Sequence, residues 1–398
     1  MSLLSEYEKR TAWKYNAITG RFSTHPALIN KVDAAGRFVP FLGSTVVFKL
    51  DRKVCQYMQC VSGILQEKPR GMLAQPIPGS AYHLTLHDLI SPEQTDATAV
   101  FTDEARTAYT AEYLREVALS LVEAEERADE IRSDYSGRRI QMRADRVVSM
   151  VSKSIVLMLR PATEEDYSFL LELYRRFDDI KNLPYPLTPH VTLAYFKPGE
   201  IDGDQLAEAI KLIQVEGCDP MMLELRVEGL FAQRFEDMGH YVDVPERICF
   251  CCDGGMNRSV MAAAILNHEA KRRRIPIRAD ARSAFPNIEG HSVPPDVIDT
   301  LAGHGISSEG ITPKARHLKK DDYVAFSSVV AMTGGALMRC TETGIPQDAY
   351  AMRSGLFLNL PDPQYGASYE AVYAIIHERV DRFLDDRAMR NKIFEDKC

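Results

Sequence analysis

An internal repeat in the first half of the chain restricts the fold more than any other feature. Apolar runs at residues 45–50 and 155–160 are each followed by a segment of helical spacing, a proline-bearing loop and a short strand that begins with histidine. The strands begin at His83 and His190, which follow Leu50 and Leu159 by 33 and 31 positions. This regular spacing predicts a duplicated α/β unit with pseudo-two-fold symmetry.

Each repeated strand carries the pattern H-x-T. Residues two apart on a strand face the same way, so His83 lies with Thr85, and His190 lies with Thr192. If a two-fold relates the copies, both pairs meet in one cleft. Imidazoles titrate near neutral pH and can act as general acid and base, while the hydroxyls can donate to phosphate oxygens. This arrangement requires no metal, and we expect no cofactor. His87 fits no such pattern, and alternation predicts it on the His83 face as a neighbour.

The duplicated H-x-T strand resembles the 2H phosphoesterase superfamily over roughly residues 36–231. This resemblance implies a bilobal α/β fold and cleavage of 2′,3′-cyclic or 1″,2″-cyclic phosphates, or of 2′-5′ linkages, in nucleotides or RNA ends. It makes His83 and His190 the acid–base pair, and Thr85 and Thr192 the phosphate-binding residues. Which histidine is the acid is left open.

The second half contains a different phosphate motif. A predicted strand at 246–252 ends in Cys252, and the string CDGGMNRS leads into a predicted helix. A strand, a glycine-bearing loop and a helix N-terminus form an anion site from backbone N–H groups. Cys252 is the expected thiolate nucleophile, Arg258 can bind two phosphate oxygens, and Ser259 can hydrogen-bond the thiolate. The loop residues expected to help bind phosphate are Gly254, Gly255 and Asn257.

A phosphatase of this kind also needs an acid to protonate the leaving oxygen, and Asp362 lies between two prolines in LPDPQYG. The second half is similar to low-molecular-weight protein tyrosine phosphatases in CDGGMNRSVMAAAI, ARSAFP, ITPKARHLKKDD and DPQYG. The similarity implies a doubly wound parallel-sheet domain and a cysteinyl-phosphate intermediate. Gly255 stands where the family usually has asparagine, Asn257 where it often has cysteine, and Thr333 where it has an acidic residue.

A change in composition near residues 234–245 divides the chain into expected domains 1–237 and 246–398. The chain has 48 basic and 56 acidic residues, a net charge of -8, which argues against binding of long nucleic acid. We expect a nucleotide or RNA-end phosphate as substrate, with a phosphoprotein as the alternative; the oligomeric state is open. No segment has the apolar length of a membrane span or of a secretory signal, so we expect a cytoplasmic protein without a membrane partner.

Together, the two motifs predict a bifunctional phosphoesterase. The first half would hydrolyse a cyclic phosphate or phosphodiester, including ADP-ribose cyclic phosphate, and the second would remove the resulting monoester. One alternative is a protein tyrosine phosphatase whose first half senses nucleotide or RNA or targets the enzyme. A second alternative is a thiol-dependent enzyme of the arsenate reductase type, which shares the cysteine loop and would need Cys340 as a redox partner.

Overall fold

The chain divides into two compact units, Met1–Val244 and Pro245–Cys398. The computed structural model describes residues 15–16, 18–67, 71–93, 109–215, 222–307 and 313–395. The first unit extends to Val244 rather than to residue 237, because β11 (His240–Asp243) pairs with β10 (Leu230–Asp237). The segment predicted to link the units is therefore a β-hairpin of the first unit.

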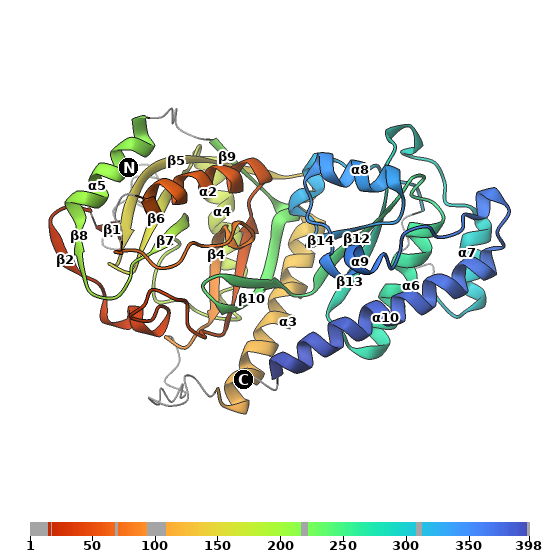
Figure 1. Ribbon diagram of the computed structural model, residues 1–398, viewed down its shortest axis with the longest axis horizontal. Coiled ribbons are helices and arrows are strands. Elements are labelled where there is room, and N and C mark those ends of the chain that lie inside the picture. Colours follow the sequence, from red (N-terminus) through yellow and green to blue (C-terminus); the bar gives the residue numbers. More distant parts are fainter. Residues whose placement is uncertain are drawn as a thin grey trace. The chain divides into compact units, whose positions relative to one another are not determined.

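The N-terminal unit is built on two antiparallel sheets (Figure 1). One has the strand order β11-β10-β3-β4; the other has the order β1-β5-β6-β7, with β9 also paired to β5. Strands β2 and β8 form a separate pair. The remaining strands of this unit are β1 (Tyr15–Asn16), β2 (Arg21–Ser23), β3 (Gly43–Lys49), β4 (His83–Ile90), β5 (Arg139–Met150), β6 (Ser154–Pro161), β7 (His190–Tyr195), β8 (Glu200–Asp202) and β9 (Met222–Arg226).

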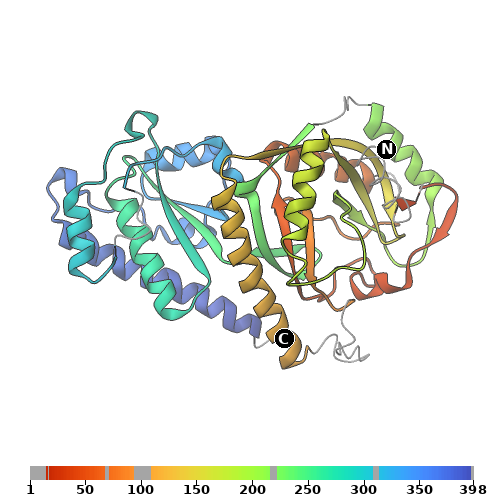
Figure 2. The ribbon, with the colours of Figure 1, turned by 180° about the vertical axis from the view of Figure 1, so that it is seen from behind.

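Within the described residues of this unit, the helices that pack on these strands are α2 (Arg52–Glu67), α3 (Ala111–Asp134), α4 (Glu164–Arg175) and α5 (Gly203–Val215). Helix α3 runs along β10, β3 and β4, as Figure 2 shows from behind. Helix α2 contacts β7, and α4 contacts β4. The helix of each repeat therefore packs against the histidine strand of the other repeat, which holds the two histidine strands next to each other.

The predicted repeat is present as β3-α2-β4 and β6-α4-β7, and the two copies share an irregularity. On β4, Thr85 pairs with Val47, and the register then shifts by one residue. On β7, Thr192 pairs with Val156, and the register shifts at the same step. A β-bulge redirects the side chains that follow it. Both copies therefore change direction directly after the H-x-T pattern.

The C-terminal unit contains a parallel sheet in the order β13-β12-β14, with helices on both faces (Figure 1). Alternate residues of β12 are buried on opposite faces: Ile248 and Phe250 pack with α6 and α10, whereas Cys249 and Cys251 pack with α8. A strand covered on both faces needs the continuous apolar run seen in the sequence. The elements are β12 (Glu246–Cys252), β13 (Ile277–Ser283), β14 (Ser328–Ala331), α6 (Arg258–Arg273), α7 (Pro295–Gly303), α8 (Gly334–Thr343), α9 (Ala349–Ser354) and α10 (Tyr369–Glu395).

Among the helices in the described parts of the chain, none combines the length and the apolar character needed to cross a membrane.

Candidate active sites

The predicted phosphate loop lies between β12 and α6. The strand ends at Cys252 and the helix begins at Arg258, so the loop amides and the helix N-terminus surround the thiol. The Cys252 Sγ lies 3.1 Å from Ser259 Oγ, and the Gly255 N–H donates to the sulfur at 3.2 Å. Both contacts stabilise a negative charge on sulfur, as a thiolate nucleophile requires.

Gly255 has a conformation and a setting that only glycine tolerates. Its φ is +62°, in the left-handed region, and an added Cβ would lie 2.6 Å from the Ser283 nitrogen and 2.7 Å from the Ser283 Cβ. The end of β13 therefore occupies the space that an asparagine side chain would need. Gly254 differs, because a Cβ there would meet only the tip of Met256, at 3.6 Å.

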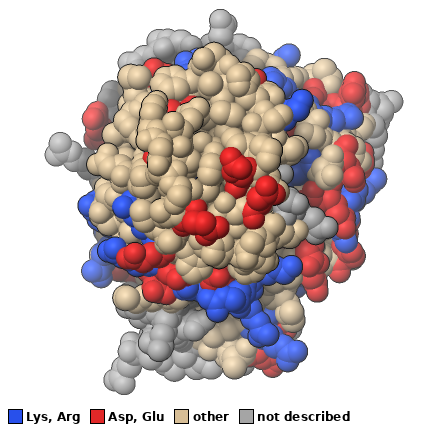
Figure 3. Space-filling view, turned by 90° about the vertical axis from the view of Figure 1, so that its right-hand side faces the viewer, with Lys and Arg blue, Asp and Glu red and all other residues tan. Residues whose placement is uncertain are grey.

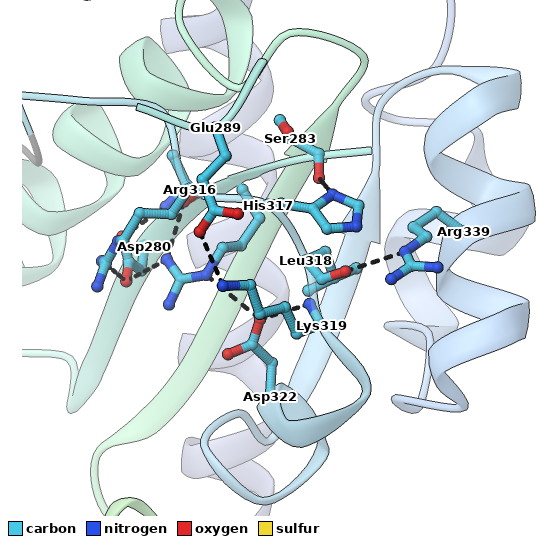
Figure 4. Close-up of polar contacts among 11 residues, drawn as sticks. Asp280, Ser283, Glu289, Arg316, His317, Leu318, Lys319, Asp322 and Arg339 are labelled. Carbon is cyan, nitrogen blue, oxygen red and sulfur yellow. Dashed lines mark hydrogen bonds and ion pairs between the residues drawn. The ribbon is translucent and has the colours of Figure 1, made fainter. Parts of the chain in front are cut away.

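Ser283, which packs against Gly255, lies in a segment that several polar contacts hold in place (Figure 4). Ser283 donates its N–H to the Arg316 carbonyl at 2.8 Å, and its own carbonyl accepts from the Leu318 N–H at 2.9 Å. The His317 Nδ1 also lies 3.2 Å from that carbonyl, and burial lowers the His317 pKa. Arg339 donates to the Leu318 carbonyl at 2.9 Å. These contacts fix Ser283, and Ser283 in turn fixes the loop.

Arg258 joins the loop to the predicted acid. Its Nη2 lies 2.7 Å from the Asp362 Oδ2, and its Nη1 donates to the Leu360 carbonyl at 3.3 Å. The Asp362 Oδ1 accepts from the Gln364 N–H, so the carboxylate also starts the short helix that follows. The buried Nε of Arg258 has no hydrogen-bond partner among the described residues. The guanidinium thus holds the acid near the loop and keeps one donor for an incoming anion.

In the N-terminal unit, His83, Thr85, His190 and Thr192 all line one cavity of about 850 Å³. Both proline loops contribute to its wall, through Ile77 in the first copy and residues 183–188 in the second. The size lies within the usual range for small-ligand sites. The sequence predicted that both pairs would meet in one cleft, and the structure brings these four side chains together.

The two histidines are held in the same way. His83 Nδ1 lies 2.8 Å from the Ala81 carbonyl oxygen, and His190 Nδ1 lies 2.6 Å from the Thr188 carbonyl oxygen. A carbonyl can only accept, so each Nδ1 carries the proton, and a neutral ring has its lone pair on Nε2. Burial lowers the pKa of His83 to about 4, and the nearby His190 adds to the shift. His83 is therefore a neutral base near pH 7.

The bulge after each threonine changes which residue follows on the cavity wall. Strict alternation predicted His87 on the His83 face, and this prediction is wrong. The shifted register brings Asp88 to the cavity, and His87 packs with its ring centroid 4.9 Å from that of Tyr174. On β7 the corresponding cavity residue is Tyr195, five positions after His190 as Asp88 is five after His83. The positions of Asp88 and Tyr195 on the cavity wall were not predicted from the sequence, because strict alternation of side chains along a strand does not account for a β-bulge.

Comparison with known proteins separates the two halves of the chain. Residues 247–394 match the family model described as low molecular weight phosphotyrosine protein phosphatase. The C-terminal unit contains a domain of this family. The match supports phosphatase activity for this low-molecular-weight phosphatase domain. A search of curated proteins found no match to the chain.

Several solved structures are similar to parts of the chain. YfkJ from Bacillus subtilis has 21% identity over 36% of this chain and 96% of its own, with a TM-score of 0.31. A YwlE arginine phosphatase from Geobacillus stearothermophilus has 25% identity over 38% of this chain and 97% of its own, with a TM-score of 0.31. A conserved protein of unknown function, ATU0111 from Agrobacterium tumefaciens, has 17% identity over 56% of this chain and 93% of its own, with a TM-score of 0.39.

A second carboxylate lies at the phosphate loop of the low-molecular-weight phosphatase domain. Asp253 accepts a hydrogen bond from the Thr333 Oγ1 at 2.7 Å, and its other oxygen lies 3.8 Å from the Arg258 Nη2. Thr333 is the position where the sequence lacks an acidic residue of the family, so Asp253 brings a carboxylate to that contact from the loop. Asp253 was not among the residues predicted from the sequence, although an acidic residue directly after a nucleophile is a visible signal.

The other cysteines within the described residues of this unit lie on the opposite face of the sheet. Cys249, Cys251 and Cys340 belong to one buried apolar cluster, whereas Cys252 belongs to the cluster on the α6 side. A hydrogen bond with Cys340, followed by burial, raises the pKa of Cys251 well above its usual value. Cys340, the expected redox partner, therefore lies across the sheet from Cys252, which does not favour the thiol relay that the arsenate reductase alternative needs.

Among the described residues, one group of side chains has ligand atoms close enough together to bind a metal ion. The ligand atoms of Glu269, His377 and Asp381 lie within 4.8 Å of one another. Arg272 pairs with Glu269, however, and Arg273 pairs with both carboxylates. These arginines already neutralise the acidic groups, so the arrangement fits a network of surface ion pairs.

Figure 3 views the end of the phosphatase unit that carries α7, the right-hand end of Figure 1. The described surface in the middle of this face is mostly uncharged, with a few acidic side chains, and Lys and Arg gather toward its edges. Phosphate backbones of long nucleic acids bind to broad basic surfaces. The described surface at the centre of this face therefore does not present the broad basic area that a long nucleic acid would need.

Proposed function

We propose that the chain is a bifunctional phosphoesterase. The N-terminal cavity hydrolyses a cyclic phosphate of a nucleotide or RNA end, and the low-molecular-weight phosphatase domain removes the phosphomonoester that results. The observation that carries the first step is the matched pair of histidines, each with Nδ1 at a carbonyl, in one cavity with two threonines. A histidine that only packs in a core would not explain why the same arrangement occurs twice and why both copies face one cavity.

The first step uses the two histidines in opposite roles. His83, whose burial keeps it neutral, accepts a proton from water as the new P–O bond forms. His190 donates a proton to the ribose oxygen whose bond to phosphorus breaks. The hydroxyls of Thr85 and Thr192 donate to the non-bridging oxygens. The product is a ribose phosphomonoester with a free neighbouring hydroxyl.

The second step uses the phosphate loop. The Cys252 sulfur attacks phosphorus and forms a cysteinyl phosphate, while Asp362 protonates the leaving ribose oxygen. Arg258 and the loop amides bind the three remaining oxygens. Asp362 then takes a proton from water, which attacks phosphorus and releases inorganic phosphate and the thiolate. Ser259, at 3.1 Å, donates to the departing sulfur.

A protein tyrosine phosphatase with a nucleotide-sensing N-terminal unit is the second candidate. One observation favours it: Phe285 and Tyr365 are exposed large aromatic residues, and Tyr365 lies just after the acid loop. Exposed aromatic side chains can contact an aryl phosphate. The two candidates differ in whether the N-terminal cavity turns over a ligand or only binds it.

Two assays on the full chain test the proposal. Ring opening of adenosine 2′,3′-cyclic phosphate is followed by chromatography, and we expect His83→Ala and His190→Ala each to lower kcat by at least about 100-fold. Cys252→Ser should leave ring opening unchanged and abolish phosphate release from the 2′- or 3′-monophosphate. If the wild type leaves the cyclic nucleotide intact but hydrolyses a phosphotyrosine peptide, the second candidate is correct.

A further inference from the structure

The cavity that contains the H-x-T residues has a second polar end. Lys31 and Lys153 both line it, and both contact Glu93: the Lys31 Nζ lies 3.6 Å and the Lys153 Nζ 3.1 Å from its carboxylate. Although burial opposes the shift, the two ammonium groups lower the pKa of Glu93, so it is ionised. Asp88 and Lys181 also line the cavity, so the lining carries three lysines for two carboxylates.

Lys31 and Lys153 are partly covered, with side chains 18% and 16% exposed. Burial lowers the Lys31 pKa, and the charge of Glu93 acts against that shift. The Lys31 ammonium also lies 4.7 Å from the centre of the Phe41 ring. Such charges are costly to keep away from water unless an anion meets them. The excess positive charge therefore favours an anionic ligand in the cavity.

The turn that presents Lys153 is strained. It joins β5 to β6, and its central residues, Val151 and Ser152, have φ of 45° and 53°. The left-handed region is unfavourable for these residue types, above all for a β-branched valine, and turns of this kind usually use Asn and Gly. Val151 and Lys153 both line the cavity. Strain that persists at a cavity wall is typical of a binding site.

Aromatic rings connect the two polar ends of the cavity. The His83 ring lies 4.5 Å from Tyr241, Tyr241 lies 5.6 Å from Phe235, and Phe235 stacks at 6.0 Å on Phe41, next to Lys31. All these rings line the cavity. A ligand that reaches from the histidines to the lysines would therefore cross a surface suited to a nucleoside.

We propose that Lys31 and Lys153 form a subsite for a second phosphoryl group of the substrate. The natural substrate then carries a cyclic phosphate at one end and a phosphate or pyrophosphate at the other. This inference rests on the proposed function and narrows its substrate class. Glu93 holds the two ammonium groups in place, and the incoming phosphate binds the positive charge that Glu93 and Asp88 do not neutralise.

The test compares two substrates that differ only in the second phosphate, adenosine 2′,3′-cyclic phosphate with and without a 5′-phosphate. We expect the 5′-phosphorylated substrate to have the lower KM in the wild type. Lys31→Met or Lys153→Met should raise that KM about tenfold, with kcat and the KM of the other substrate little changed. Lys53→Met, an exposed lysine on α2 outside the cavity lining, is the matched control. Equal KM values in the wild type, or equal effects of the variants on both substrates, would overturn the subsite.

A binding measurement separates failure of the subsite from failure of the proposed function. In Cys252→Ser protein, which cannot hydrolyse monoesters, calorimetry compares adenosine 3′,5′-bisphosphate with adenosine 3′-phosphate. Tighter binding of the bisphosphate that is lost in Lys31→Met supports the subsite even if no cyclic phosphate is opened. Equal affinities for the two ligands refute the subsite and leave the ring-opening proposal to its own assay.

Discussion

His83 and His190 are held by the same hydrogen bond, from Nδ1 to the carbonyl oxygen of the residue two positions earlier in the chain. Each bond lies directly before an H-x-T strand with a bulge after the threonine. In its neutral form, each ring therefore has its lone pair on Nε2. A pair of bases in matched settings needs only a difference in environment to become an acid and a base.

That difference predicts a pH dependence of stability. The His83 pKa falls from 6.5 to about 4 on folding, so between these values the unfolded chain binds more protons than the folded chain. The free energy of unfolding of the N-terminal unit should therefore fall as pH decreases from 6.5 to 4, by on the order of 1–3 kcal/mol from this group. Urea unfolding of wild type and His83→Gln at several pH values measures it. An equal pH dependence in the two proteins would contradict the assignment.

Replacing Gly255 should lower phosphatase activity far more than replacing Gly254. Gly255→Ala places a Cβ 2.6 Å from the Ser283 nitrogen in a left-handed conformation, so the loop must move. We expect kcat/KM for p-nitrophenyl phosphate to fall about 100-fold, since small displacements of catalytic groups have effects of that size. Gly254→Ala, where a Cβ meets nothing nearer than 3.6 Å, is the control and should stay within about threefold of wild type. Similar losses in both variants would refute the role of Ser283.

The loss of activity on replacing Asp362 should increase with the basicity of the leaving group. Asp362→Asn removes the proton donor, so kcat for phenyl phosphate or a ribose monophosphate should fall about 10²- to 10⁴-fold. The fall for p-nitrophenyl phosphate should be smaller, because its leaving group needs less protonation. Asp299→Asn, an exposed carboxylate on α7, provides the comparison. Equal losses on both substrates would mean that Asp362 acts only by holding Arg258.

Asp253 should weaken phosphate binding. Its carboxylate lies 3.8 Å from the Arg258 Nη2, so it competes with an incoming phosphate for the guanidinium. Asp253→Asn keeps the shape and removes the charge, and we expect KM for phosphomonoesters to fall by about two- to fivefold, as for an ion pair at the protein surface. Steady-state kinetics at low ionic strength measures it. A rise in KM would instead assign Asp253 to substrate binding.

Local patterns predicted much of this molecule. The internal repeat and the strand-loop-helix around Cys252 follow from apolar spacing, glycine and the placement of reactive residues, and each has its counterpart in the structure. The direction of His87 could not be predicted, because the bulge depends on pairing with β3. Residues 234–245 were taken for a linker because they contain several charged residues, and the pairing of β11 with β10 forms only in the folded unit.

Contacts between residues that are far apart in the sequence could not be predicted either. Lys31 and Lys153 are separated by more than a hundred positions and share Glu93 only after folding. Ser283 was part of a recognised string, yet its role in filling the space beside Gly255 depends on where β13 ends. Contacts between distant segments of this kind leave no periodic signal.

We propose that one chain performs two phosphate-cutting steps in order. Phosphorus-31 NMR of adenosine 2′,3′-cyclic phosphate with wild-type protein and with Cys252→Ser follows both steps in one experiment. We predict that wild type converts the cyclic phosphate to inorganic phosphate through a monoester, and that Cys252→Ser accumulates the monoester. A cyclic phosphate signal that stays unchanged with both proteins, while wild type hydrolyses p-nitrophenyl phosphate, would rule out the ring-opening step.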